Sequence, residues 1–101
     1  MNYMQKQVDE WVQRNGGYWS PVWIMTRLTE ENGELAREIS HQFGPKKKKS
    51  SEDKKEIREE IGDMLFTLCC MANALEISLD DSFKETMKKY ESRDKERFGK
   101  K

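Results

Sequence analysis

The sequence predicts an all-α protein, a small four-helix bundle that is completed by homo-oligomerisation. Apolar residues recur at helical spacing in every segment between strong breakers, and no segment alternates apolar and polar residues as a half-buried strand would. The 101 residues fit one domain, residues 1–101. Although 38% of the residues are charged, three Trp, four Phe, three Tyr and six Met supply bulky apolar groups for a core.

The first two helices have clear start and stop signals. The first is predicted from about Asn2 to Arg14 and ends at Asn15-Gly16-Gly17. Its apolar face consists of Met4, Val8, Trp11 and Val12. The second begins with Ser20 as N-cap and Pro21 in the first turn, where the missing N–H of proline leaves no hydrogen bond unmade. It continues for about 22 residues, until Gly44-Pro45.

The third and fourth helices follow a polar loop, Lys46 to Ser51. The third is predicted from about Ser51 to Leu75, with acidic residues in its first turn, where the helix dipole favours them. A break at Glu76-Ile77-Ser78 precedes the fourth helix, which reaches about Arg97. One side of this last helix carries Leu79, Phe83, Met87 and Tyr90.

The third helix is apolar on almost every side between Met64 and Leu75. A helix of this kind has to be covered on all sides, and three partner helices in a chain of this size can hardly do so. We therefore expect a homo-oligomer, a dimer or a tetramer.

Charge and composition exclude several classes of partner. With 19 basic and 19 acidic residues the net charge is zero, so no nucleic-acid partner is expected, and Lys46 to Lys49 are interpreted as a solvated loop. The longest apolar run, Met64 to Ala72, is too short to span a membrane, and the polar N-terminus does not resemble a signal peptide. The neighbouring pair Cys69 and Cys70 fits neither a disulfide framework nor a metal motif, so a reducing, cytoplasmic location is expected.

Carboxylates occupy positions where a core is expected. In the second helix the apolar stripe is Ile24, Leu28, Leu35 and Ile39. Glu31 lies in the middle of this stripe, Glu34 lies on its flank, and Glu38 follows one turn later. In the third helix the stripe is Ile57, Ile61, Met64 and Leu68. Glu60 lies at its edge and Asp63 lies further round, so each helix offers two acids spaced three residues apart.

Like charges gathered inside a bundle require compensation by a cation. Oxygen ligands suit a hard ion, Mg²⁺ with Mn²⁺ as a substitute, whereas zinc sites usually recruit His or Cys. Glu38-x-x-His41 matches half of a di-iron motif, but His41 is the only histidine. Since Mg²⁺ keeps coordination positions for phosphate oxygens, phosphate chemistry is the leading hypothesis. For one such acid pair alone, a solvated helix face would be the better interpretation.

Two stretches resemble a known family. They are Leu28-Thr29-Glu30-Glu31-Asn32-Gly33-Glu34-Leu35-Ala36-Arg37-Glu38 and Glu59-Glu60-Ile61-Gly62-Asp63-Met64-Leu65-Phe66, and each contains Glu-Glu-x-Gly-acid. They resemble the MazG-type nucleotide pyrophosphohydrolases of the all-α NTP pyrophosphatase superfamily, in particular the short, single-domain bacterial members. The likeness extends from Tyr18-Trp19-Ser20-Pro21 to Arg93-Asp94-Lys95.

The resemblance implies Mg²⁺-dependent hydrolysis of a nucleoside triphosphate, noncanonical and deoxy forms included, to the monophosphate and pyrophosphate. By motif position, the metal ligands are Glu31, Glu34, Glu60 and Asp63. Water would attack a phosphorus of the triphosphate chain. The carboxylate of Glu34 or Glu38 would orient this water or act as the base that deprotonates it. Attack on the α or the β phosphorus, and the preferred base and sugar, remain open.

Other polar and aromatic residues are candidates for substrate binding. Asn73 is an amide in an apolar stretch, so it needs a partner, either a ligand or a neighbouring helix. Lys89 and Arg93 share one face of the fourth helix and resemble the family's phosphate-binding basic pair, although a solvated surface pair would have the same spacing. Trp19 is able to stack on a nucleobase or to pack in a core or interface.

A second class of function also fits the sequence. A helical oligomer that binds a divalent metal or a nucleotide for regulation, without turnover, would carry the same acidic residues. A purely structural bundle is the third interpretation.

Overall fold

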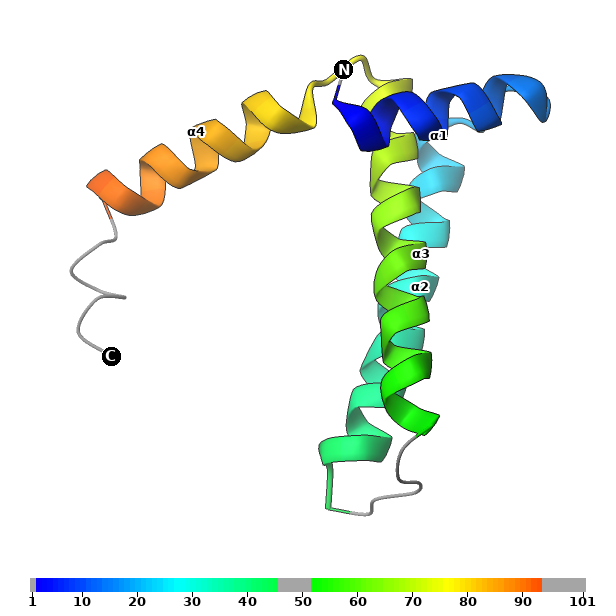
Figure 1. Ribbon diagram of the computed structural model, residues 1–101, viewed down its shortest axis with the longest axis vertical. Helices are drawn as coiled ribbons and strands as arrows, with labels where there is room; N and C mark the ends of the chain where they lie inside the picture. Colours follow the sequence, from blue (N-terminus) through cyan, green and yellow to red (C-terminus); the bar gives the residue numbers. More distant parts are fainter. Residues whose placement is uncertain (1, 46–51, 94–101) are drawn as a thin grey trace.

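The computed structural model describes residues 2–45 and 52–93, which form four α-helices (Figure 1). They are α1 (Tyr3–Arg14), α2 (Pro21–Phe43), α3 (Glu52–Ala74) and α4 (Leu79–Ser92). The described part of the chain contains no strand, so the predicted all-α class is confirmed. The predicted loop at Lys46–Lys49, the start at Ser51 and the end at Arg97 lie outside the described residues.

Helix starts follow the capping signals of the sequence. The side chain of Asn2 accepts a hydrogen bond from Gln5 N at 2.7 Å, which caps α1. The hydroxyls of Ser20 and Ser78 cap α2 and α4 in the same way, at 3.4 and 3.2 Å. Each cap satisfies a backbone N–H that has no partner inside the helix, and such caps contribute about 1 kcal/mol. The segment after α1 turns through Gly16, whose φ of 107° is a conformation that other residues avoid.

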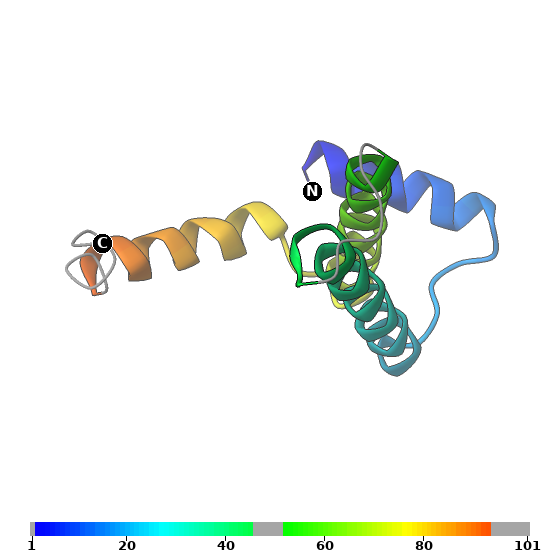
Figure 2. The same cartoon turned by 90° about the horizontal axis from the view of Figure 1, so that it is seen from below.

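Only two of the four described helices pack against each other along their length. The long helices α2 and α3 run antiparallel side by side, α1 lies across one end of this pair, and α4 projects away from it (Figures 1 and 2). No single helix in the described residues is long and apolar enough to cross a membrane, although α3 from Glu56 onward and α4, bent by 103°, pass that test as a pair.

The core lies where α1 crosses α3. Val8 and Val12 of α1 are buried against Cys69 of α3, and partly buried Tyr18, Cys70 and Leu79 pack around them. The prediction for α1 is therefore correct for Val8 and Val12, whereas Met4 and Trp11 stay largely exposed. This core is small, so polar contacts have to contribute to holding the helices together.

One buried glutamine connects three segments. Gln5 is only 2% exposed, and its Nε2 donates to Asn73 Oδ1 and to the carbonyl of Ile77, both at 2.8 Å. Its Oε1 accepts from the backbone N–H of Leu79 at 2.9 Å. One side chain of α1 thus holds the end of α3, the following turn and the first residue of α4. Buried hydrogen bonds of this kind are costly to leave unmade.

Tyr18 extends this network toward α1. Its hydroxyl donates to Asp9 Oδ1 at 2.6 Å and accepts from Asn73 Nδ2 at 2.9 Å. Burial, followed by the hydrogen bond to Asp9, raises the pKa of Tyr18 to about 12. The hydroxyl therefore stays neutral and remains a donor at physiological pH.

The apolar stripe predicted for α3 is not a buried stripe in the single chain. Ile61 and Leu68 are exposed, and they line an apolar groove between α2 and α3 together with Met25, Leu28 and Leu35. Because α3 is apolar on almost every side, its periodicity defines no unique buried direction. Buried Thr67, which bonds to Glu31 of α2, fixes the rotation of α3 instead.

The α4 helix has no buried residue, and Phe83 is 65% exposed. Its start is attached by Gln5 and by a hydrogen bond of 3.1 Å from Asn2 Nδ2 to Asp80 Oδ1. Its apolar side carries Phe83, Met87 and Tyr90, all of which are exposed in the described part of the chain.

We expect Gln5→Met to destabilise the fold. Methionine keeps the length of the side chain but leaves Asn73 Oδ1, the Ile77 carbonyl and the Leu79 N–H without their partner. The free energy of unfolding should fall by about 2–4 kcal/mol, measured by urea denaturation. Exposed Gln7→Met, on the same helix, should change it by less than about 0.5 kcal/mol. A loss below about 1 kcal/mol for Gln5→Met would contradict the role given to this network.

Candidate functional site

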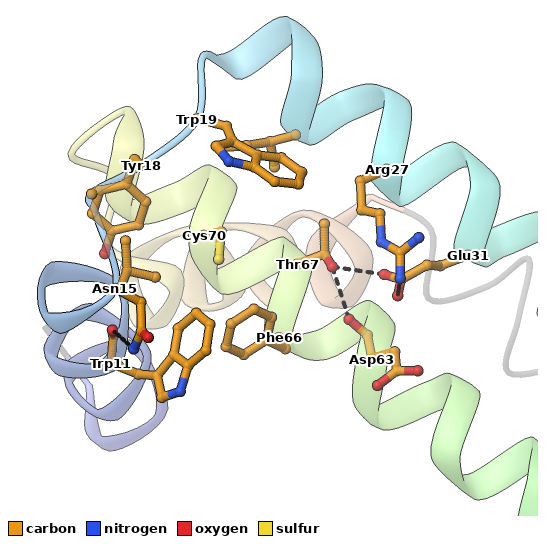
Figure 3. Close-up of a pocket in the computed structure, with 13 residues that line it drawn as sticks. Trp11, Asn15, Tyr18, Trp19, Arg27, Glu31, Asp63, Phe66, Thr67 and Cys70 are labelled. Atoms are coloured by element: carbon orange, nitrogen blue, oxygen red, sulfur yellow. Dashed lines mark hydrogen bonds and ion pairs between the residues drawn. The ribbon is translucent and has the colours of Figure 1, made fainter.

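Glu31 is held between α2 and α3 at the centre of the site. It is 2% exposed, in the position that the apolar stripe of α2 predicts. Its Oε1 accepts a hydrogen bond of 2.6 Å from Thr67 Oγ1, and its Oε2 lies 3.4 Å from Nη2 of Arg27 (Figure 3). Both oxygens of this buried carboxylate thus have a partner, as burial requires.

Glu60 faces the same region from α3, and it shares a side-chain hydrogen bond with another acid, Glu34. Its Oε2 is buried without a hydrogen-bond partner. Burial raises the pKa of Glu60 first of all, and the negative charges of Glu34, Asp63 and Glu31 raise it further. The charges of the other three acids proposed from the sequence thus all reach Glu60. The four side chains lie in one region between α2 and α3, although they do not form a ligand set as they stand.

The four carboxylates between α2 and α3 carry more negative charge than the neighbouring Arg27 can balance. Arg27 pairs with Glu31 and, at 3.7 Å, with exposed Glu30. One guanidinium cannot balance four carboxylates, and the pKa of Glu60 is raised by burial first and by the neighbouring negative charges second.

A hard divalent cation fits this donor set. All ligand atoms would be oxygens, and the buried Oε2 of Glu60 is an acceptor that the chain itself does not use. As the side chains stand, no three His, Cys, Asp or Glu groups among the described residues are arranged as a ready ligand set. Carboxylates that repel one another keep apart, and a cation removes this repulsion.

A cleft of about 410 Å³ opens at two of these acids, Glu31 and Asp63. Aromatic rings form one end of it, with Trp11, Tyr18, Trp19 and Phe66. Polar and charged groups form the other end, with Arg27, Glu31, Asp63 and Thr67 (Figure 3). The rings of Trp11 and Phe66 meet edge to face, with centroids 5.6 Å apart. The cleft thus suits a ligand with a flat apolar part and an anionic part bound through a cation.

The other candidates from the sequence lie in different places. Trp19, 64% exposed, lines the aromatic end of the cleft. Glu38 is half-buried on α2, one turn beyond Glu34. Lys89 and Arg93 are exposed on or just after α4, which lies far from the pair of α2 and α3 in both views (Figures 1 and 2). The chain by itself therefore does not bring this basic pair to the acids.

Asn73 lies outside the cleft. Its Nδ2 donates to the Gln5 carbonyl at 3.0 Å and to Tyr18 at 2.9 Å, and its Oδ1 accepts from Gln5 Nε2. Of the two kinds of partner that the sequence left open, the structure shows the neighbouring helix.

Several residues of the site were not identified from the sequence. Thr67 was visible only as a polar interruption of an apolar run, and Arg27 only as a cation four residues before Glu31. Trp11 and Phe66 looked like ordinary core residues. Cys70 also lines the cleft, and burial raises the pKa of its thiol to about 11, so it is not a nucleophile at neutral pH.

Comparisons with known proteins show the family of the chain. Residues 20–98 match the family model of the MazG nucleotide pyrophosphohydrolase domain. The chain is 50% identical to the uncharacterized protein YpjD of Bacillus subtilis over 102 residues, which cover 100% of this chain and 92% of the relative.

Two solved structures have the same fold. The crystal structure of YpjD from Bacillus subtilis has a TM-score of 0.80 and 48% identity, covering 89% of this chain and 96% of that chain. The crystal structure of a Bacillus-conserved MazG protein, a nucleotide pyrophosphohydrolase, has a TM-score of 0.77 and 42% identity, covering 95% and 97%. The chain therefore belongs to the MazG nucleotide pyrophosphohydrolase family.

Proposed function

We propose that this protein hydrolyses nucleoside triphosphates, noncanonical and deoxy forms included, to the monophosphate and pyrophosphate, with Mg²⁺ as cofactor and Mn²⁺ as a substitute. The observation that carries the proposal is the buried, unpartnered Oε2 of Glu60 among three further acids, beside an aromatic cleft. Membership of the family supports the same reaction class.

The acids of α2 and α3 form the metal site in this proposal. Glu31, Glu34, Glu60 and Asp63 would hold the ion. When bound, Mg²⁺ supplies the positive charge that these carboxylates and the triphosphate oxygens share. Thr67 contributes by fixing the carboxylate of Glu31.

The cleft binds the remainder of the nucleotide. Its aromatic end, including Trp19, offers flat apolar surface for the base, and Arg27 offers a guanidinium to the phosphates. Water attacks the α or the β phosphorus and the bond from that atom to the oxygen bridging them breaks. Pyrophosphate is the leaving group in the first case and the monophosphate in the second, and both routes give the same two products. Glu34 or Glu38 would take the proton of the water. Glu34 acts electrostatically on Glu60, and Glu38 follows Glu34 one turn later on α2.

We also propose a homo-oligomer, a dimer or a tetramer, as the working form. A second copy would cover the apolar groove lined by Ile61 and Leu68 and the bare side of α4. Lys89 and Arg93 would then reach the phosphates at the site of a partner copy, because α4 carries them away from the site of their own chain (Figure 1). The free thiols Cys69 and Cys70 suit a reducing, cytoplasmic setting.

The alternative, a regulatory module that binds metal or nucleotide without turnover, would use the same cleft and acids. The two functions are separated by whether pyrophosphate is released.

We expect Glu60→Gln to abolish turnover. Purified protein, Mg²⁺ and a panel of ribo- and deoxynucleoside triphosphates should yield monophosphate and pyrophosphate, and EDTA should stop the reaction. Glu60→Gln should lower kcat/KM by about 100-fold or more. It should also raise Tm in EDTA. The raised pKa of Glu60 means that its ionised form destabilises the folded state at neutral pH, and glutamine removes this charge.

The control for this experiment is Glu59→Gln, an exposed acid of α3 next to Glu60. It should leave kcat/KM within about twofold. Turnover that persists in EDTA, or in Glu60→Gln, would contradict the metal-site proposal. Binding of metal and nucleotide without any turnover would favour the regulatory module.

Complementation tests the shared site. Glu60→Gln and the double variant Lys89→Ala/Arg93→Ala should each be inactive. A refolded equimolar mixture should regain roughly a quarter of the wild-type activity, because random assembly leaves about one composite site in four intact. Sedimentation should show a dimer or a tetramer for wild type and a smaller species for Ile61→Lys. A monomeric, fully active wild type, or a mixture without activity, would refute the oligomer proposal.

A further inference from the structure

Two different groups hold the carboxylate of Glu31. Thr67 Oγ1 donates to Oε1 at 2.6 Å, a short hydrogen bond between buried side chains. Arg27 Nη2 lies 3.4 Å from Oε2, and the side chain of Arg27 is 49% exposed. One partner of Glu31 is therefore rigid and buried, and the other is long, flexible and half in solvent (Figure 3).

Thr67 is fixed by its own helix as well. Its Oγ1 lies 3.0 Å from the carbonyl of Asp63, one turn earlier in α3, so the hydroxyl is held between the two oxygens. A buried β-branched side chain with this contact has little freedom to change rotamer. Its contact with Oε1 of Glu31 is thus a permanent part of the packing of α2 against α3.

Arg27 lies where a bound ligand would compete with it for the carboxylate of Glu31. It is the only cationic side chain that lines the cleft among the described residues, and it lies at the boundary between the acids and the open volume. A divalent ion near Glu31 repels the guanidinium and competes with it for Oε2. A guanidinium is also well suited to bind phosphate oxygens with two parallel hydrogen bonds.

We propose that Arg27 serves as an exchangeable counter-ion: it neutralises Glu31 while no divalent ion is bound, and it moves to the phosphates of the nucleotide when one is. Thr67 keeps Oε1 of Glu31 in place in both states and is a positioning residue. This inference rests on the proposed function. It adds that metal binding and nucleotide binding are cooperative, because both depend on the movement of the Arg27 side chain.

Opposite effects on two affinities distinguish this role from a structural one. Arg27→Gln removes the competitor of the metal, so Mn²⁺ alone should bind about three- to tenfold more tightly, measured by isothermal titration calorimetry. In saturating Mg²⁺ the same variant should bind a nucleoside triphosphate analogue with a methylene bridge between the α and β phosphorus atoms about tenfold more weakly. Arg27→Lys keeps the charge and should recover part of the nucleotide affinity.

Thr67→Val tests the other half of the proposal. Valine keeps the shape of threonine but gives no hydrogen bond to Oε1, so Mn²⁺ should bind about tenfold more weakly while the folded state persists by circular dichroism. The matched control is Arg37→Gln, an exposed arginine further along α2 that does not line the cleft, and it should change neither affinity by more than about twofold.

The outcomes separate this inference from the proposed function. If wild type binds Mn²⁺ and turns over nucleotide, but Arg27→Gln leaves the Mn²⁺ affinity unchanged or lowers it, the exchange of Arg27 is refuted. The proposed hydrolase function is then unaffected. If wild type binds no Mn²⁺ at all, both proposals fail. Tighter metal binding together with weaker nucleotide binding in the one variant would establish the exchange.

Discussion

The packing of α2 against α3 places carboxylates where these helices would otherwise share an apolar core, and the site is built around this constraint. Glu31 is buried at the contact, and the short hydrogen bond from Thr67 fixes the rotation of α3 relative to α2. The same rotation turns Glu60 toward Glu34 and leaves Oε2 of Glu60 buried without a partner. The arrangement costs stability in the isolated chain, because like charges lose hydration and repel one another. An excess of negative charge of this kind is what the proposed cation site would use.

The remainder of the molecule compensates for a small core. Where α1 crosses α3, Gln5 and Asn73 join α1, the end of α3 and the start of α4 by buried hydrogen bonds. This network positions the aromatic end of the cleft, because Tyr18 belongs both to the network and to the cleft lining. Neither the network nor the core covers the groove between α2 and α3 or the apolar side of α4. Among the described residues, much apolar surface thus remains exposed, and this is the surface that the proposed second copy would cover.

Much of the local structure could be predicted from the sequence. Ser20-Pro21, Ser78 and the glycines after α1 set helix ends through hydrogen bonds and backbone geometry that depend on near neighbours. The burial of Glu31 was equally predictable, because the apolar stripe of α2 is narrow and has one direction. The orientation of α3 was not predictable, since a helix that is apolar on all sides gives no preferred face. The networks of Gln5 and Arg27 were also missed: each depends on which polar groups meet after packing, and a single sequence does not contain that information.

The central claim is that the acids around Glu60 form a divalent-cation site. Crystals soaked in Mn²⁺ and measured at the manganese absorption edge test it most directly, because the anomalous signal locates the ion without reference to activity. We expect an anomalous peak between the carboxylates of α2 and α3, within ligand distance of Glu31 and Glu60, with Oε2 of Glu60 as one of the ligands. Saturating Mn²⁺ that gives no peak there, or peaks only elsewhere on the protein, would contradict it.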